Sequence, residues 1–280
     1  MRLRLTLRIL ASLTAFGVTL SLLAFSAASR VYSGGIQQNA VLEAPTRNAN
    51  ASDTISGIVV ARESGAPVRG AVVSVPALNR STVSGADGRF SLSGLPQGQR
   101  FILNIAKTGF SPESLTLQSG INAKGPLRAT LSASSGVLAL DNVWRHLGDN
   151  RYSTRSAGAS AFRLDAGGPA IRLPFSTAGV TLSRAPILRI GAVLGLDTEA
   201  AHAAGQSRLR ISSSPAQILL NGRVIGELAL NGSGQSFQTP PGLIIPNGMN
   251  LLEIRSGYQL PLSDPIDFDD FEFMTLTLSL

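Results

Sequence analysis

Short strand-like segments separated by glycine-containing turns run through the chain from Thr54 onward, and they constrain its fold most strongly. Residues 71–75 alternate small or apolar side chains with others at the period of two expected for a half-buried strand. Ser64-Gly65 and Asp87-Gly88 place glycines where hairpin turns need a positive φ angle. With 29 glycines, 15 prolines and only 15% charged residues, the composition favours turn-rich β structure over helices.

The N-terminal 28 residues are predicted to be an export signal. The basic residues at the start are Arg2, Arg4 and Arg8. Residues 9–28 carry no charge and end in Ser26-Ala27-Ala28, small residues of the kind that signal peptidase recognises. The uncharged run is also long enough to span a bilayer as a helix. The segment 1–28 is therefore either a cleaved signal peptide or a membrane anchor, with residues 9–28 as the tether. Both alternatives predict an exported protein that is periplasmic, at the cell surface or secreted.

The charge pattern after this leader gives no support to nucleic-acid binding. The net charge of +7 falls to about +4 without the three leader arginines, and the remaining arginines are scattered. No basic run with interleaved aromatic residues occurs. The chain also has no cysteine, which excludes disulfides and thiolate metal sites. Residues 29–52 are polar, lack periodicity and are predicted to be a linker.

Five segments of residues 53–133 carry recognisable turn and core motifs. These segments are Ser56-Gly-Ile-Val59, Gly65-Ala-Pro-Val-Arg-Gly-Ala-Val-Val73, Asp87-Gly-Arg-Phe-Ser-Leu92, Leu95-Pro-Gln-Gly98 and Gly109-Phe110. Together they resemble the carboxypeptidase regulatory-like domain, a transthyretin-like sandwich. The resemblance implies a non-catalytic spacer or docking module on an exported protein, with no zinc.

Residues 137–280 are again strand-like and follow a short seam of Ser, Ala and Gly. Within them, Asn221-Gly222 predicts the type I′ turn of a β-hairpin. Four motifs occur in order: Trp144–Asn150, Leu220–Gly226, Asn250–Gly257 and Asp269–Phe273. Together they resemble the galactose-binding-like jelly roll of carbohydrate-binding modules. The predicted fold class is therefore all-β, with two antiparallel β-sandwich domains, one transthyretin- or Ig-like and one a jelly roll, after an N-terminal hydrophobic helix.

A run of carboxylates leads into the last predicted strand. Its members are Asp264, Asp267, Asp269, Asp270 and Glu272. Because side chains alternate between the faces of a strand, Asp270 and Glu272 are predicted to share a face with Leu276. If that face is the core face, these charges need a metal, an arginine or a bulge that turns them away, since an unpaired buried charge is very unfavourable.

The jelly-roll resemblance implies a structural Ca²⁺ site made by an early loop and the acidic start of the last strand. The implied metal ligands are Asp149, Asn150, Asp269, Asp270 and Glu272. Calcium takes six to eight oxygen ligands, and both segments are rich in oxygen atoms. The alternative is a solvated acidic loop that pairs with Arg145, Arg151 or Arg155.

Several loop residues have the chemistry to bind a sugar through stacking and hydrogen bonds. They are Trp144, His146, Arg151, Tyr152 and Tyr258. Core packing is the favoured alternative for Trp144, the only tryptophan, because large aromatic residues dominate protein cores. His202 is interpreted as a surface loop residue.

Catalytic motifs are absent from the sequence. Asp269, Asp270 and Glu272 are too close in sequence to flank a glycoside from opposite sides. No Gly-x-Ser-x-Gly motif occurs, and two histidines without cysteine are too few for the common metal-hydrolase sites. The sequence predicts a non-enzymatic, exported envelope protein whose jelly roll binds carbohydrate or an envelope protein. The alternatives are a structural subunit of an envelope or secretion assembly and a minor polysaccharide hydrolase.

Overall fold

The computed structural model describes residues 52–118, 126–152, 164–181, 186–196, 210–261 and 266–279. These residues form β-strands and one 3₁₀ turn, Pro76–Leu78, which confirms the predicted all-β class. In the described ranges no helix has the length and apolarity needed to cross a membrane. The predicted leader with its hydrophobic helix, most of the linker, Asp264, Arg155 and His202 lie outside the described residues.

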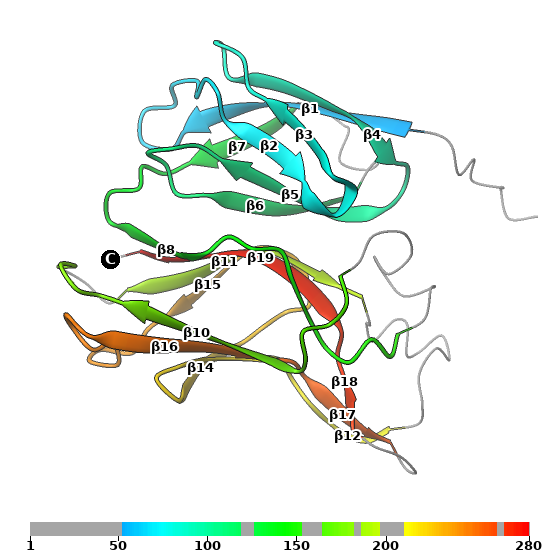
Figure 1. The fold of residues 1–280 in the computed structure, drawn as a ribbon, viewed down its shortest axis with the longest axis vertical. Coiled ribbons are helices and arrows are strands. Elements are labelled where there is room, and N and C mark those ends of the chain that lie inside the picture. The colour runs from blue at the N-terminus through cyan, green and yellow to red at the C-terminus, as the bar shows by residue number, and fades with distance from the viewer. Residues whose placement is uncertain are drawn as a thin grey trace, which may run out of the picture. The chain divides into compact units, whose positions relative to one another are not determined.

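The first sandwich contains β1 to β7 in two sheets (Figure 1). One sheet has the order β4 (Arg89–Pro96), β1 (Ser52–Ala61), β7 (Leu127–Leu131). The other has the order β3 (Arg80–Val83), β2 (Val72–Val75), β5 (Arg100–Ala106), β6 (Glu113–Gln118). The pairs are antiparallel, as predicted, except β1 with β7, which is parallel.

Local turn chemistry explains how the first sandwich connects its strands. Gly65 and Gly88 have φ angles of +69° and +74°, as their predicted turns require. A Cβ on Gly88 would approach the carbonyl oxygen of Val59 to 2.5 Å, so this turn also needs glycine for space. The alternating strands then enclose a core that includes Val73, Leu95 and Phe101, all fully buried.

The second sandwich packs two antiparallel sheets against each other. One has the order β15 (Asn231–Gln238), β11 (Ile187–Gly195), β19 (Phe271–Ser279), β8 (Val137–Asp141), with β9 (Arg145–Leu147) also paired to β19. The other has the order β10 (Ala170–Ser176), β16 (Met249–Arg255), β13 (Gln217–Leu220), β14 (Arg223–Glu227). A small third sheet joins β12 (Arg210–Ser214), β17 (Tyr258–Pro261) and β18 (Asp267–Phe268). The finer jelly-roll assignment stays a prediction.

The β13–β14 hairpin forms as predicted. Leu220 pairs with Arg223 across the turn, and Asn221 and Gly222 have φ angles of 47° and 81°. Positive φ at both central residues is the requirement of a type I′ turn.

Strand β19 changes the face of its side chains at Thr275. Phe271 and Phe273 lie in the core of the second sandwich together with Leu276 and Leu278, although strict alternation places the two pairs on opposite faces. The change occurs at Thr275, which has a φ angle of 65°, in the left-handed region. The predicted shared face of Asp270, Glu272 and Leu276 is therefore wrong. The backbone irregularity, one of the alternatives considered for these charges, turns the carboxylates away from the leucine face.

The two sandwiches pack against each other within a single compact unit, Arg47–Leu280. Strands β5 and β6 contact β11 and β19. The interface has a buried apolar cluster, which we call the interface cluster: Ile102, Ala192, Leu194, Leu196 and Met274. Full burial of each leucine contributes about 1.5–3 kcal/mol, so the cluster is a substantial part of the joint between the sandwiches.

Two hydroxyl groups of β6 also bond to the second sandwich. Ser114 Oγ donates to the carbonyl of Met274 and Thr116 Oγ1 to the carbonyl of Val193, each at 2.8 Å. Gly191 lies directly against Ser114, and a Cβ there would overlap the Ser114 hydroxyl and approach its amide nitrogen to 3.0 Å. Glycine at this position therefore permits the close contact between the sheets.

Candidate functional site

A polar cluster, buried except for Asn150, joins the loop after β9 to the start of β19. We call it the clasp cluster; its residues are His146, Asn150, Asp270 and Glu272. His146 lies opposite Glu272 in the β9–β19 ladder. His146 Nε2 lies 2.8 Å from Asp270 Oδ1, and the backbone N–H of Asn150 donates to the same oxygen at 2.9 Å. The side chains of His146 and Asp270 are both fully buried.

The clasp cluster also holds the segment that begins at Leu164. His146 Nδ1 lies 2.5 Å from the carbonyl oxygen of Leu164, and Glu272 accepts the Leu164 N–H at 3.0 Å. Asn150 Oδ1 accepts the N–H of Ala166 at 3.0 Å. These bonds connect three separate parts of the chain, so the cluster has a clear structural role.

The hydrogen-bond partners of His146 define its protonation. Nδ1 faces a backbone carbonyl and Nε2 faces a carboxylate, and both partners are acceptors, so both ring nitrogens carry a hydrogen. Burial opposes this charged form. The hydrogen bonds to Asp270 and Leu164, with the charges of Asp270 and Glu272, nevertheless raise the pKa of His146 above its ordinary value of 6.5. The surroundings thus favour the imidazolium form of His146.

Asp149 links the same loop to β18. Its Oδ1 accepts the N–H of Arg151 at 3.1 Å and its Oδ2 that of Phe268 at 3.2 Å. Burial raises the pKa of Asp149, the two backbone hydrogen bonds lower it, and the charges of Asp270 and Asp267 add to the rise. The early loop and the acidic start of the last strand therefore do come together.

Asp269 belongs to a different set of contacts. Its backbone N–H donates to the carbonyl of Gly257 at 2.8 Å, and its side chain lies against Gly257, where a Cβ would overlap it. The structure thus separates Asp269 from Asp270, because neighbouring side chains leave an extended chain on opposite sides.

The predicted calcium site stays a prediction. Within the described ranges no group of three or more His, Asp and Glu side chains is arranged to hold a metal ion. Asp149 and Asp270 take His146 and backbone N–H groups as partners, and the arginine alternative does not apply to these two carboxylates. Arg145 pairs with Asp141 instead. The side-chain partner of Asp270 is thus His146, which the sequence had placed among the candidate sugar ligands.

The five predicted sugar-binding residues separate into a set that is buried or partly buried and an exposed set. Trp144 and Tyr152 pack against the interface cluster, in agreement with the core-packing alternative for Trp144. His146 is buried in the clasp cluster, its ring 5.9 Å from that of Tyr152. Arg151 and Tyr258 are exposed. The second set therefore offers a ligand the most exposed side chains.

Arg151 and Tyr258 both contact the short strand β18 or the residue before it. Arg151 Nη1 donates to the carbonyl of Ile266 at 3.4 Å. Tyr258 pairs with Phe268, and their rings meet edge to face at 6.4 Å. Ile266 is 43% exposed and Tyr258 36%. We call these four residues the β18 surface.

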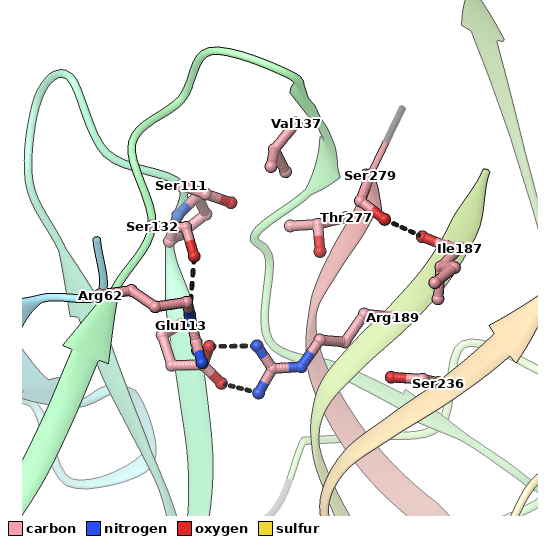
Figure 2. Close-up of a pocket in the computed structure, with 11 residues that line it drawn as sticks. Arg62, Ser111, Glu113, Ser132, Val137, Ile187, Arg189, Ser236, Thr277 and Ser279 are labelled. Atoms are coloured by element: carbon pink, nitrogen blue, oxygen red, sulfur yellow. Dashed lines mark hydrogen bonds and ion pairs between the residues drawn. The ribbon is translucent and has the colours of Figure 1, made fainter. Parts of the chain in front are cut away.

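A pocket of about 350 Å³ lies where β6 meets β11 and β19 (Figure 2). Arg189 donates two hydrogen bonds to Glu113, of 2.6 and 2.7 Å, across this pocket. Burial raises the pKa of Glu113, although the charge and hydrogen bonds of Arg189 act in the opposite direction. Sequence reasoning missed this pair because its members are 76 positions apart and neither belongs to a motif.

Comparison with known proteins gives a match for part of the chain. No curated protein matches the sequence. Two solved structures are similar at low level: a proposed carbohydrate-binding protein from Bacteroides uniformis and a DUF3823 family protein from Parabacteroides merdae. Their sequences are 11% and 10% identical to this one. The alignments cover 81% and 79% of this chain and 98% and 95% of the other chain, and both have a TM-score of 0.21. A score this low carries no weight for fold or function. Residues 54–132, however, match the family model of the carboxypeptidase regulatory-like domain, as their turn and core motifs predict.

Proposed function

We propose that the chain is a non-enzymatic, exported envelope protein whose second sandwich binds carbohydrate at the β18 surface. The observation that carries this proposal is the convergence of Arg151 and Tyr258 on β18. They are the two exposed members of the five residues with sugar-binding chemistry. The leader motif in the sequence of residues 1–28 supports export, and the match of residues 54–132 supports a non-catalytic role for the first sandwich.

The β18 surface combines the groups that a sugar ring needs. The half-exposed ring of Tyr258 offers an apolar face for stacking and a hydroxyl for hydrogen bonds. The guanidinium of Arg151 has five N–H donors, of which the contact to Ile266 uses one. The remaining donors serve sugar hydroxyls next to the aromatic ring.

Burial of the titratable residues supports the non-enzymatic assignment. His146 and Asp270 are the pair best suited to acid–base chemistry, yet their side chains have no exposure. A general acid or base must come within hydrogen-bond distance of the substrate or of one bridging water. The hydrogen bonds of this pair to Leu164 and Asn150 serve the fold instead.

Binding to a panel of glycans that includes cell-wall polysaccharides tests the proposal. We expect the full chain to bind at least one glycan, and Tyr258→Ala and Arg151→Ala each to weaken that binding about tenfold or more. Met249→Ala and Arg128→Ala are matched controls because both residues are exposed and lie outside the β18 surface. Absence of binding to every glycan, or equal binding by all four variants, contradicts the proposal.

A structural role in an envelope assembly is the second candidate function, and one observation favours it. Val72 and Val83 are direct cross-strand partners, 44% and 59% exposed, at the β3 edge of their sheet. Paired apolar side chains near a sheet edge favour contact with another protein. Under this alternative, Val83→Lys disrupts a defined assembly seen by size-exclusion chromatography of envelope extracts, while glycan binding is unchanged.

A further inference from the structure

We propose that the pocket between β6 and β11 binds a small ligand that carries both a carboxylate and several hydroxyl groups, such as a hexuronate. This site is separate from the β18 surface and uses residues of both sandwiches (Figure 2). Its volume of about 350 Å³ is at the lower end of the range for small-molecule pockets, which fits a single sugar ring rather than a chain.

Arg189 and Glu113 form a neutral wall of the pocket. Both guanidinium Nη atoms of Arg189 bond to the Glu113 carboxylate, whose side chain is only 8% exposed. The bidentate geometry holds both side chains in place, so this pair supplies a rigid frame and no net charge. A ligand therefore interacts with the charge of other groups.

Arg62 lies close enough to Glu113 for their charges to interact, and two arginines beside one carboxylate leave the pocket with an excess positive charge. Its Nε donates to Ser132 Oγ at 2.9 Å, and this bond orients the guanidinium along the pocket wall. Its two Nη groups have no hydrogen-bond acceptor among the described residues. A guanidinium with free, planar N–H groups matches a carboxylate, which accepts two parallel hydrogen bonds. The pocket therefore favours an anionic ligand of this geometry.

Unused hydroxyl groups line other parts of the pocket. They belong to Ser111, Ser236 and Thr277, and none of them has a side-chain hydrogen bond to any described residue. Each hydroxyl is both a donor and an acceptor, as are the hydroxyls of a polyol. Ser111 and Thr277 are each 8% exposed, which places them in the deeper part of the site.

These observations together select the ligand class. A neutral sugar matches the hydroxyl groups but brings no charge to the Nη groups of Arg62, whose only nearby carboxylate among the lining residues, Glu113, already takes both Nη hydrogen bonds of Arg189. A simple anion such as sulfate or acetate matches Arg62 but leaves the hydroxyl groups of Ser111 and Thr277 unused. A uronate satisfies both sets of groups at once.

Isothermal titration calorimetry of the full chain with defined probes tests the proposal. We expect glucuronate or galacturonate to bind, and glucose, galactose, acetate and sulfate each to bind at least about tenfold more weakly, since a hydrogen bond to a charged group contributes about 1.5–3 kcal/mol. Binding by acetate or sulfate that equals uronate binding overturns the proposal, as does equal binding by the neutral sugars or no uronate binding.

Variants connect the binding to this pocket. Arg62→Ala is expected to weaken uronate binding about tenfold or more, and Arg62→Lys to recover only part of it, because lysine lacks the planar fork. Thr277→Val keeps the shape and removes one hydroxyl, so it weakens uronate and leaves acetate unaffected. Arg128→Ala, on an exposed face of β7, is the matched control. Tyr258→Ala should retain uronate binding, which separates this site from the β18 surface. Unchanged uronate affinity in both Arg62→Ala and Thr277→Val contradicts the proposal.

Discussion

His146 Nε2 lies 2.8 Å from Asp270 Oδ1, and neither side chain is exposed to solvent. The pair joins β9 to the start of β19, and Asn150 bonds to the same carboxylate oxygen. A buried ion pair adds little when it is compared with apolar residues, but removal of one partner leaves the other charge buried and unpaired. We therefore expect single substitutions in this pair to lower the free energy of unfolding strongly.

We expect Asp270→Asn to lower the free energy of unfolding by about 3 kcal/mol or more, because an amide leaves the His146 charge without its hydrogen-bonded counter-ion. Urea denaturation followed by circular dichroism measures the change. Asp87→Asn is the matched control: Asp87 pairs with Arg89 on the surface, and such pairs contribute at most about 1 kcal/mol. An equal loss of unfolding free energy in the two variants would show that His146 and Asp270 do not form a buried ion pair.

The stability of the protein should depend on pH through His146. The pKa of His146 is raised in the folded protein above its ordinary value of 6.5, so the folded state binds the proton more tightly than the unfolded state. The stabilisation is complete below pH 6.5 and is lost as the pH rises through the folded pKa. We therefore expect the unfolding free energy of the wild type to fall as the pH rises from 6.5 through the folded pKa of His146. His146→Gln should lack this decrease, and a parallel decrease in both proteins argues against the assignment.

The close contact of Gly191 with Ser114 should make the joint between the sandwiches sensitive to one methyl group. Gly191→Ala places a Cβ against the Ser114 hydroxyl, which already bonds to Met274. Overpacking of this kind costs about 1–3 kcal/mol, so we expect a lower melting temperature by calorimetry. Gly167→Ala is the control, because its Cβ would lie at an ordinary 3.6 Å from its nearest neighbour. An unchanged melting temperature for Gly191→Ala would mean that the interface adjusts freely.

Calcium addition distinguishes the two interpretations of the acidic segment. The oxygens of Asp149 and Oδ1 of Asp270 already accept hydrogen bonds, and we therefore expect millimolar calcium or a chelator to leave the melting temperature unchanged. A melting temperature that rises with calcium and falls again on chelation supports the metal site predicted from sequence instead. Asp269→Asn serves as a comparison, since this carboxylate lies away from Asp270.

Local features of the sequence predicted the turns and the strand positions. Asn221 and Gly222 adopt the two positive φ angles of their hairpin, and Gly88 in the first sandwich adopts the positive φ angle that its turn requires. These outcomes depend on the conformational preferences of single residues and on the alternation of a strand, both of which are visible in a short window. The motifs of residues 54–132 also sufficed to identify the first sandwich.

Contacts between distant residues required the tertiary structure. Strand β19 changes the face of its side chains at Thr275, a residue that does not mark such an irregularity in the sequence as a glycine would. This change of face decides which side chains of β19 lie in the core. Trp144 is an aromatic residue suited to sugar stacking, but in the structure its side chain packs against the interface cluster. Glu113 and Arg189 become partners because two sheets pack face to face. Sequence alone therefore determined the strands and turns of this protein, since these are local. Only the packing of the sheets decided which polar and aromatic groups are buried and which remain free to bind, since burial depends on what covers each face.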